Sequence, residues 1–150
     1  MTTKFASLAD FKAAVGTELG TSNWHTVTQE QINLFAQATG DHQWIHVDPE
    51  KAKDGPFGTT IAHGYLTLSL LPVLSTETYE IEGLTMGLNY GANKVRFPAP
   101  VPVDSRIRAT AKLLDITDIA IGSQATIQFT VEREGGDKPV CIAEVIYVMG

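Results

Sequence analysis

The sequence predicts an α+β protein in which one antiparallel sheet wraps around a central buried helix. Two observations carry this prediction. Residues 106–114, 123–132 and 139–148 are successive segments of strand length joined by short turns, as in an antiparallel meander. A helix that begins near His63 and Gly64 carries apolar residues on nearly all sides, which is typical of a buried helix. Such a helix must cover one face of the sheet, and this fixes the fold class.

The first 60 residues are mainly helical or irregular. Residues 1–20 are predicted to form a short helical lead-in that ends near Gly16. A clear helix follows Thr28, a good N-cap residue, and it should end at Gly40. Residues 41–60 are polar and interrupted by proline and glycine, so we expect an irregular segment with one short turn of helix.

The second half has the period of strands. Residues 88–97 form one strand, and a proline-rich connection follows it at 98–102. Residues 106–114 and 123–132 alternate apolar and polar side chains, so each should have one buried and one exposed face. Residues 139–148 are apolar on both faces, which favours a central strand.

Composition limits the function. The chain has 150 residues, 43% of them hydrophobic, which suits a single domain over residues 1–150. Its 11 Lys and Arg against 17 Asp and Glu give a net charge of −6, which argues against a nucleic-acid partner. The single Cys141 allows no internal disulfide and no Cys-x-x-Cys site. No apolar run is long enough to span a membrane, and the first ten residues do not resemble a signal peptide, so we expect a cytoplasmic protein.

The polar segment at residues 40–49 carries two histidines, His42 and His46, and two aspartates, Asp41 and Asp48. It could be a solvated loop. It could be a metal site, although the two histidines would serve as joint ligands only on a helix, which a nearby proline and glycine disfavour. It could also be an acid–base site, in which a carboxylate and an imidazole hold and deprotonate one water. The spacing alone leaves all three open.

A second polar point lies at His63 and Gly64, where the buried helix starts. Free N–H groups in the first turn of a helix can stabilise negative charge on a carbonyl oxygen, and a glycine lets a substrate approach them. The alternative is that Gly64 only relieves crowding where the helix meets the sheet.

These motifs resemble a known family. Asp41, four residues, His46, one residue, Asp48-Pro49 and then Ala62-His63-Gly64 resemble the signature of the MaoC-like, (R)-specific enoyl-CoA hydratases. The downstream strand and proline loop, Asn89 to Val101, look like that family too. The resemblance covers roughly residues 20–148. It implies the hot-dog fold, a long antiparallel sheet around one helix, and a homodimer.

The resemblance also implies an activity and a site. The reaction would be hydration of a trans-2-enoyl thioester to an (R)-3-hydroxyacyl thioester, which makes the protein a hydro-lyase. Asp41 and His46 would bind the attacking water, and the Gly64 N–H would stabilise the thioester oxygen. No metal and no cofactor would be needed, because coenzyme A belongs to the substrate.

The sequence departs from the common family pattern Asp-x-Asn-Pro-x-His at Gln43 and Trp44. Gln43 keeps an amide that could still hydrogen-bond near the site. Trp44 loses the fixed φ of proline but can hold the loop by burying its ring. We therefore expect Gln43 to support the catalytic pair. His63 is also expected to be a supporting residue, as a hydrogen-bonding side chain that orients the Gly64 turn.

Other functions remain open at this point. The same chemistry could run as dehydration of a (3R)-hydroxyacyl thioester of an acyl carrier protein in fatty-acid synthesis. Thioester hydrolysis and non-catalytic binding of acyl thioesters are also possible on this fold. The acyl chain length is open as well, although leucines of the buried helix could shape a tunnel.

Basic residues are concentrated in the strands. Lys94, Arg96, Arg106 and Arg108 all lie opposite the apolar set, so neighbouring strands would present one basic face. Such a face could bind the phosphates of coenzyme A. An ordinary solvated sheet face explains the same pattern.

The remaining candidates are expected to be structural. Asp48 before Pro49 suits a turn or helix cap, and His42 suits the loop surface. His25 has no evident functional partner, and Cys141 suits a small residue of the core.

Overall fold

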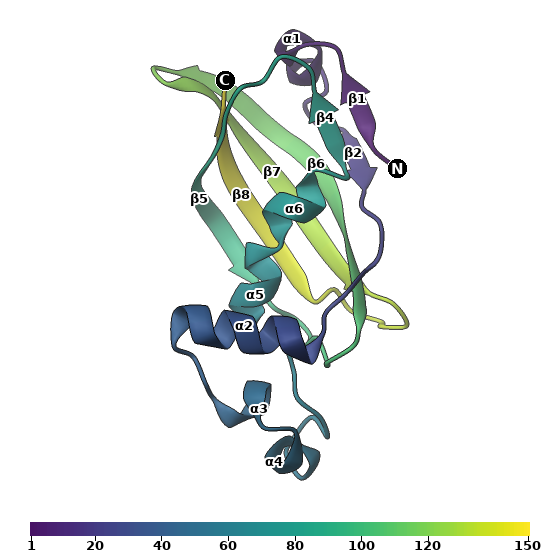
Figure 1. Cartoon of the computed structure of the whole chain (residues 1–150). Helices are drawn as coiled ribbons and strands as arrows, with labels where there is room; N and C mark the ends of the chain where they lie inside the picture. Colours follow the sequence, from purple (N-terminus) through teal and green to yellow (C-terminus); the bar gives the residue numbers. More distant parts are fainter.

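The computed structural model describes residues 1–150, and its main feature is a curved antiparallel sheet (Figure 1). The long strands are β5 (Gly87–Arg96), β6 (Arg106–Ile119), β7 (Gly122–Arg133) and β8 (Cys141–Met149). Their order in the sheet is β6-β7-β8-β5, so β8 lies between two strands and is central, as its two apolar faces predicted.

Shorter strands complete the sheet and add a second one. β2 (Glu18–Thr21) and β3 (His25–Thr26) both pair with β6 at the edge opposite β5. β1 (Thr3–Phe5) pairs in parallel with β4 (Tyr79–Ile81) in a separate two-stranded sheet. The predicted helical lead-in is therefore a strand, a short helix α1 (Leu8–Lys12) and a second strand.

The core confirms the predicted strand faces. Alternate side chains of β6 and β7 are completely buried. In β6 they are Ile107, Ala109, Ala111 and Leu113. Period-two burial of this kind needs a cover on the inner face of the sheet, and helices supply it.

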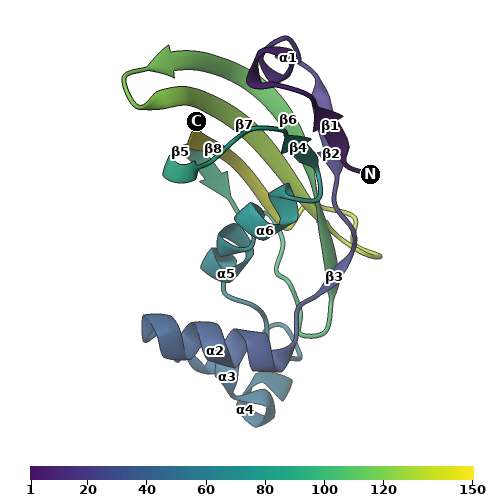
Figure 2. The ribbon, with the colours of Figure 1, turned by 45° about the horizontal axis from the view of Figure 1, so that its top comes forward.

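Two consecutive helices, α5 (Gly64–Ser69) and α6 (Leu71–Ser75), lie inside the curve of the sheet (Figure 2). The sequence predicted one helix, and it is interrupted at Leu70. Pro72 has no N–H to donate to the carbonyl four residues before it, so a regular helix cannot continue through this point.

The prediction that this helix is buried on nearly all sides is wrong for one face. Leu66, Leu71 and Leu74 are buried against the sheet. Tyr65 and Val73, however, are 69% and 51% exposed. One chain therefore covers only part of its central helix.

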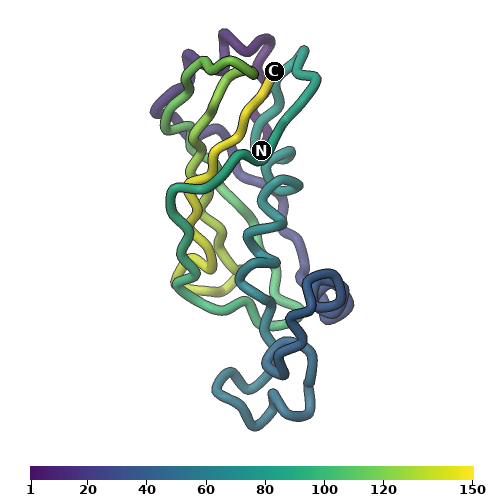
Figure 3. Tube along the Cα trace, turned by 90° about the vertical axis from the view of Figure 1, so that its left-hand side faces the viewer, coloured from purple at the N-terminus to yellow at the C-terminus, as the bar shows by residue number.

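A second group of helices lies beyond one end of the sheet (Figure 1). They are α2 (Gln29–Thr39), α3 (Trp44–Val47) and α4 (Pro49–Lys53). Thr28 caps α2 by accepting the N–H of Gln31 at 3.1 Å, and Gly40 ends it with φ of 84°, as predicted. The segment from 41 to 60 contains two short helices where one turn was expected, and Figure 3 shows it projecting past the sheet.

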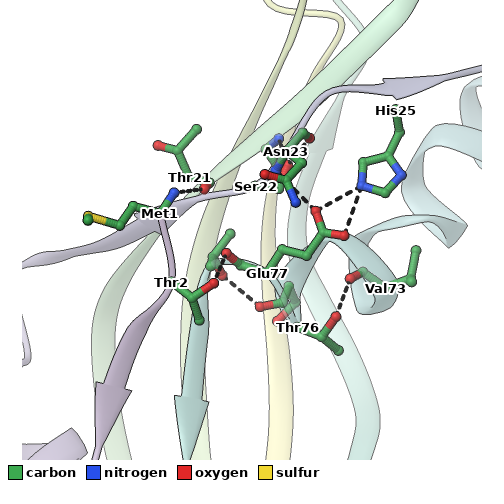
Figure 4. Close-up of polar contacts among 12 residues, drawn as sticks. Met1, Thr2, Thr21, Ser22, Asn23, His25, Val73, Thr76 and Glu77 are labelled. Carbon is green, nitrogen blue, oxygen red and sulfur yellow. Dashed lines mark hydrogen bonds and ion pairs between the residues drawn. The ribbon is translucent and has the colours of Figure 1, made fainter.

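The amino terminus is held near the carboxyl end of α6, away from this second group of helices (Figure 4). The Met1 ammonium donates to the carbonyl of Thr21 at 2.6 Å, and the Thr2 hydroxyl donates to the carbonyl of Glu77 at 2.8 Å. No helix in the structure combines the length and apolarity needed to cross a bilayer.

Candidate active site

His46 lies in the single turn of α3 and is buried. Its Nδ1 is 2.8 Å from the carbonyl oxygen of Ile61. Because a carbonyl can only accept, Nδ1 carries the hydrogen, and Nε2 keeps a free lone pair. Burial lowers the pKa of His46, and His63 lowers it further, against the opposing effects of the Ile61 hydrogen bond and Asp41. His46 is therefore a neutral base at neutral pH.

Asp41 approaches His46 from the loop after α2. Its side chain is exposed, and one carboxylate oxygen accepts the Gln43 N–H at 3.3 Å. A carboxylate oxygen of Asp41 and a ring nitrogen each of His46 and His63 lie within 4.8 Å of one another. Two groups that share a water are separated by up to twice a hydrogen bond of about 2.8 Å. The arrangement can therefore hold one water between Asp41 and His46.

The two buried histidines are stacked. The rings of His46 and His63 are 3.9 Å apart between centroids and inclined by 22°. A metal ion bound to an imidazole lies in the plane of that ring at about 2 Å from the nitrogen. Two rings whose planes are this close to parallel cannot both direct a lone pair at one ion. The donor set is therefore poor for a metal, although three suitable residue types meet here.

His46 and Gly64 line the same cavity of about 350 Å³. The rest of the wall is mostly apolar and includes Phe97 and Val101. Gly64 is the first residue of α5, so its N–H has no acceptor within the helix. A Cβ at Gly64 would lie 2.9 Å from the Phe97 ring, so the absence of a side chain is also required for packing.

A polar clip behind His46 was not predicted. Gln29, at the start of α2, donates to the backbone carbonyl of His46 at 2.8 Å. The buried Thr60 hydroxyl donates to the Gln29 side-chain oxygen at 2.6 Å. These contacts tie the α3 turn to α2 across long separations in the chain. No local pattern distinguishes Gln29 or Thr60 from other helix-start or loop residues.

The two departures from the family pattern have different outcomes. The Gln43 side chain makes no hydrogen bond, and its backbone N–H is what contacts Asp41. Trp44 is half-buried and packs on Gly55, where a Cβ would lie 2.9 Å from the indole ring. The Lys51 ammonium is 4.9 Å from the centroid of the indole ring. Trp44 thus holds the loop as expected.

The structure does not bring the four basic residues together. β5, with Lys94 and Arg96, is separated from β6, with Arg106 and Arg108, by two strands, or about 14 Å. The expectation of one basic face on neighbouring strands is therefore wrong, because strand order differs from sequence order. Both β6 arginines also form ion pairs, with Glu134 and Glu132, which leaves only the two residues of β5 without a carboxylate partner.

The minor candidates lie where the sequence suggested, with one addition. His42 is exposed, and Asp48 caps α4 by accepting the Lys51 N–H at 3.1 Å. Cys141 is buried in β8, and burial raises the pKa of its thiol to about 11. His25 does have a partner, because its Nε2 lies 2.8 Å from a carboxylate oxygen of Glu77.

Comparison with known proteins agrees with this fold. The chain matches the family model described as MaoC like domain over residues 10–135. It is 60% identical over 143 residues to 3-hydroxyacyl-thioester dehydratase Z of Mycobacterium tuberculosis, and the match covers 95% of each chain.

Two solved structures share the architecture. A protein of Archaeoglobus fulgius described as a monoamine oxidase regulatory protein superposes with a TM-score of 0.76 at 25% identity, covering 99% of this chain and 96% of that one. The (R)-hydratase from A. caviae involved in PHA biosynthesis superposes with a TM-score of 0.70 at 21% identity, covering 89% and 97%. Because the family model spans most of the sequence, the chain belongs to the MaoC-like dehydratase family of hot-dog proteins and is a hydro-lyase.

Proposed function

We propose that the protein interconverts a (3R)-hydroxyacyl thioester and the trans-2-enoyl thioester, with dehydration as its working direction. The observation that carries the proposal is the convergence of Asp41, His46 and His63 within 4.8 Å beside a cavity that also contains Gly64. The sequence motifs alone led us to expect hydration. The 60% identity to a relative named a 3-hydroxyacyl-thioester dehydratase supports the reverse direction.

His46 is the proton-transfer group in this proposal. In dehydration, Nε2 removes a proton from C2, the C3–O bond breaks, and the departing hydroxide takes that proton from His46 and leaves as water. Asp41 holds the oxygen throughout, because its carboxylate reaches the same space as the imidazole. With Asp41 and His46 on the same side of the bound substrate in this proposal, loss or addition of water is syn.

Gly64 serves the other end of the substrate. Removing the C2 proton moves charge to the thioester oxygen. A backbone N–H at the start of α5 can stabilise that charge, and the apolar wall around it keeps water from competing.

The decisive experiment follows the reaction in both directions. We expect crotonyl-CoA to lose its ultraviolet enoyl absorbance and to yield (R)-3-hydroxybutyryl-CoA, and the (R) product to be converted back. In deuterated water the addition should be syn. An (S) product would overturn the proposal, and release of free coenzyme A without a hydroxyacyl product would identify a thioesterase instead.

The carrier of the acyl group is tested separately. We propose coenzyme A or an acyl carrier protein, both of which present a phosphopantetheine thioester. Lys94 and Arg96 are the two candidate contacts for additional phosphate, because neither is paired with a carboxylate. Lys94→Ala with Arg96→Ala should raise KM for crotonyl-CoA but not for crotonyl-pantetheine. An equal effect on both substrates would remove these residues from phosphate binding.

We also propose that the protein works as a homodimer. β5 pairs only with β8, which leaves its outer edge unpaired, and Leu88 and Tyr90 of this strand are 42% and 54% exposed. An unpaired strand edge with apolar side chains offers a template for pairing with another chain. The exposed face of α5 and α6, with Tyr65 and Val73, is a second apolar surface that one protomer leaves uncovered.

Light scattering should give twice the 16.2 kDa of one chain. Tyr90→Lys should weaken the dimer, whereas Val15→Lys, at an exposed position just before β2 and therefore at the opposite edge of the sheet, should not. A fully active 16.2 kDa particle at every concentration would contradict the proposal.

A further inference from the structure

We infer that His63 is a positioning residue that fixes Asp41 against His46 and so builds the water site from two separate segments. This inference rests on the function proposed above. The imidazole of His63 is buried, with 3% of the residue exposed, and it contacts both Asp41 and His46. Its Nε2 is 2.9 Å from the backbone carbonyl oxygen of Asp41, and its ring is stacked on His46 at 3.9 Å.

The hydrogen bond to Asp41 fixes the tautomer of His63. A carbonyl only accepts, so Nε2 carries the hydrogen and Nδ1 keeps its lone pair. Nδ1 is buried and has no hydrogen-bond partner. A buried, unpaired nitrogen is unfavourable, and a phenyl ring would fill the same space without it. What a phenyl ring could not do is donate to Asp41, and this contact explains why a histidine stands at this position.

Asp41 needs such an anchor. It follows Gly40, the left-handed residue that ends α2, and its side chain is exposed. Apart from His63, its backbone and carboxylate are held by two long contacts, at 3.4 Å to the Thr39 hydroxyl and 3.3 Å to the Gln43 N–H. The 2.9 Å bond from the buried His63 is the short link between this loop and the core.

His63 also limits the freedom of His46. The stacked ring closes one face of the His46 imidazole, and the Ile61 carbonyl holds its Nδ1. His46 can then direct only Nε2 toward a water. Phe35 of α2 packs on His63 with ring centroids 4.9 Å apart, so α2 in turn supports the ring on which His46 is stacked.

Two substitutions separate the hydrogen bond from the packing. His63→Phe keeps a stacked ring and removes the donor, whereas His63→Gln keeps an N–H at a similar reach and removes the ring. We expect His63→Phe to lower kcat by about 10²-fold with little change in KM, because displacement of a catalytic group by about 1 Å has this effect. His63→Gln should recover part of that loss. Phe35→Leu disturbs the packing of His63 but keeps its donor, so any loss of kcat in this variant measures the contribution of packing alone.

The decisive readout is a double-mutant cycle with Asp41→Asn. If His63 acts through Asp41, then His63→Phe should cost little further activity once the Asp41 carboxylate is gone.

Additive losses in the cycle, or a loss in His63→Phe that only follows a lower Tm, would overturn the inference. These outcomes differ from failure of the proposed function. A fully active Asp41→Asn enzyme would remove the function, whereas a slow Asp41→Asn beside a normal His63→Phe would remove only the role of His63.

Discussion

The molecule contains two histidine–carboxylate pairs, near opposite ends of the central helices, and they are built differently. At the α6 end, His25 Nε2 lies 2.8 and 3.0 Å from the two carboxylate oxygens of Glu77, and the contact joins residues 52 positions apart (Figure 4). At the α5 end, no direct hydrogen bond joins Asp41 to His46, and each is held by backbone partners instead.

The difference separates a structural pair from a reactive one. In the His25–Glu77 pair, Nε2 and the carboxylate bond each other directly, so these atoms do not hold a water between them. In the Asp41–His46 pair the backbone satisfies one side of each residue and leaves a carboxylate oxygen and Nε2 free. A site for water needs this second arrangement, because donors and acceptors that are already paired cannot bind it.

The largest effect on turnover is expected from mutating the reactive Asp41–His46 pair. Asp41→Asn and His46→Gln should each lower turnover by about 10²–10⁴-fold, the range for a general acid–base group, with little change in Tm. The double variant should lose less than the product of the two, because both residues act on one water. Steady-state kinetics and thermal unfolding test this, and near-normal turnover in either single variant would contradict the assignment.

The next largest effect is expected at Gly64. Gly64→Val introduces a branched side chain where even a Cβ would lie 2.9 Å from the Phe97 ring, inside the cavity that His46 lines. We expect kcat/KM to fall by about 10²-fold through substrate exclusion. Phe97→Ala makes room for the added side chain and is the matched control. A fully active Gly64→Val enzyme would leave Asp41 and His46 in place and remove the role given to this helix start.

The structural pair should affect stability and not turnover. The pKa of Glu77 lies below its usual value: burial acts to raise it, but hydrogen bonds from His25 and the Asn23 N–H outweigh burial. A lowered carboxyl pKa stabilises the fold above the unfolded pKa and loses that contribution as the pH falls through the folded pKa.

Glu77→Gln should therefore lower the free energy of unfolding by about 1 kcal/mol at pH 7, a modest value because both side chains are partly exposed. Urea unfolding curves of the variant and the wild type should converge in acid, below roughly pH 4. A difference that persists there would mean that the carboxylate charge is not the cause, and a loss of kcat would mean that this pair also serves the reaction.

The smallest expected effect is that of a chelator. The stacked rings of His46 and His63 cannot share an ion, so treatment with EDTA should leave kcat unchanged. Loss of activity that zinc restores would show that the Asp41–His46 pair binds a metal. The contrast between a structural pair and a pair that binds water would then no longer hold.

The sequence predicted what depends on local chemistry. The period-two pattern of residues 106–114 and 123–132 gave the buried faces of β6 and β7, and Thr28 and Gly40 gave both ends of α2. These features follow from neighbours a few residues apart.

What the sequence did not predict depends on contacts between distant residues. Three such contacts join residues separated by 22 to 52 positions. They are the His25–Glu77 pair, the hydrogen bond between Thr60 and Gln29, and the bond from His63 to Asp41. The prediction of a single basic face was wrong for a related reason, since β5 and β6 follow each other in the chain but are not neighbours in the sheet. In both cases the missing information was which segments lie side by side.

The rate at which Cys141 reacts reports how often the strands around it separate. The thiol is buried in β8, opposite Val131 of β7, and its pKa of about 11 leaves very little reactive thiolate at neutral pH. It is also the only cysteine in the chain. Alkylation must therefore wait until the strands around it separate, and the rate of labelling measures how often they do. A disturbance at the catalytic loop can be read in this rate, because the neighbouring Val140 lines the same cavity as His46.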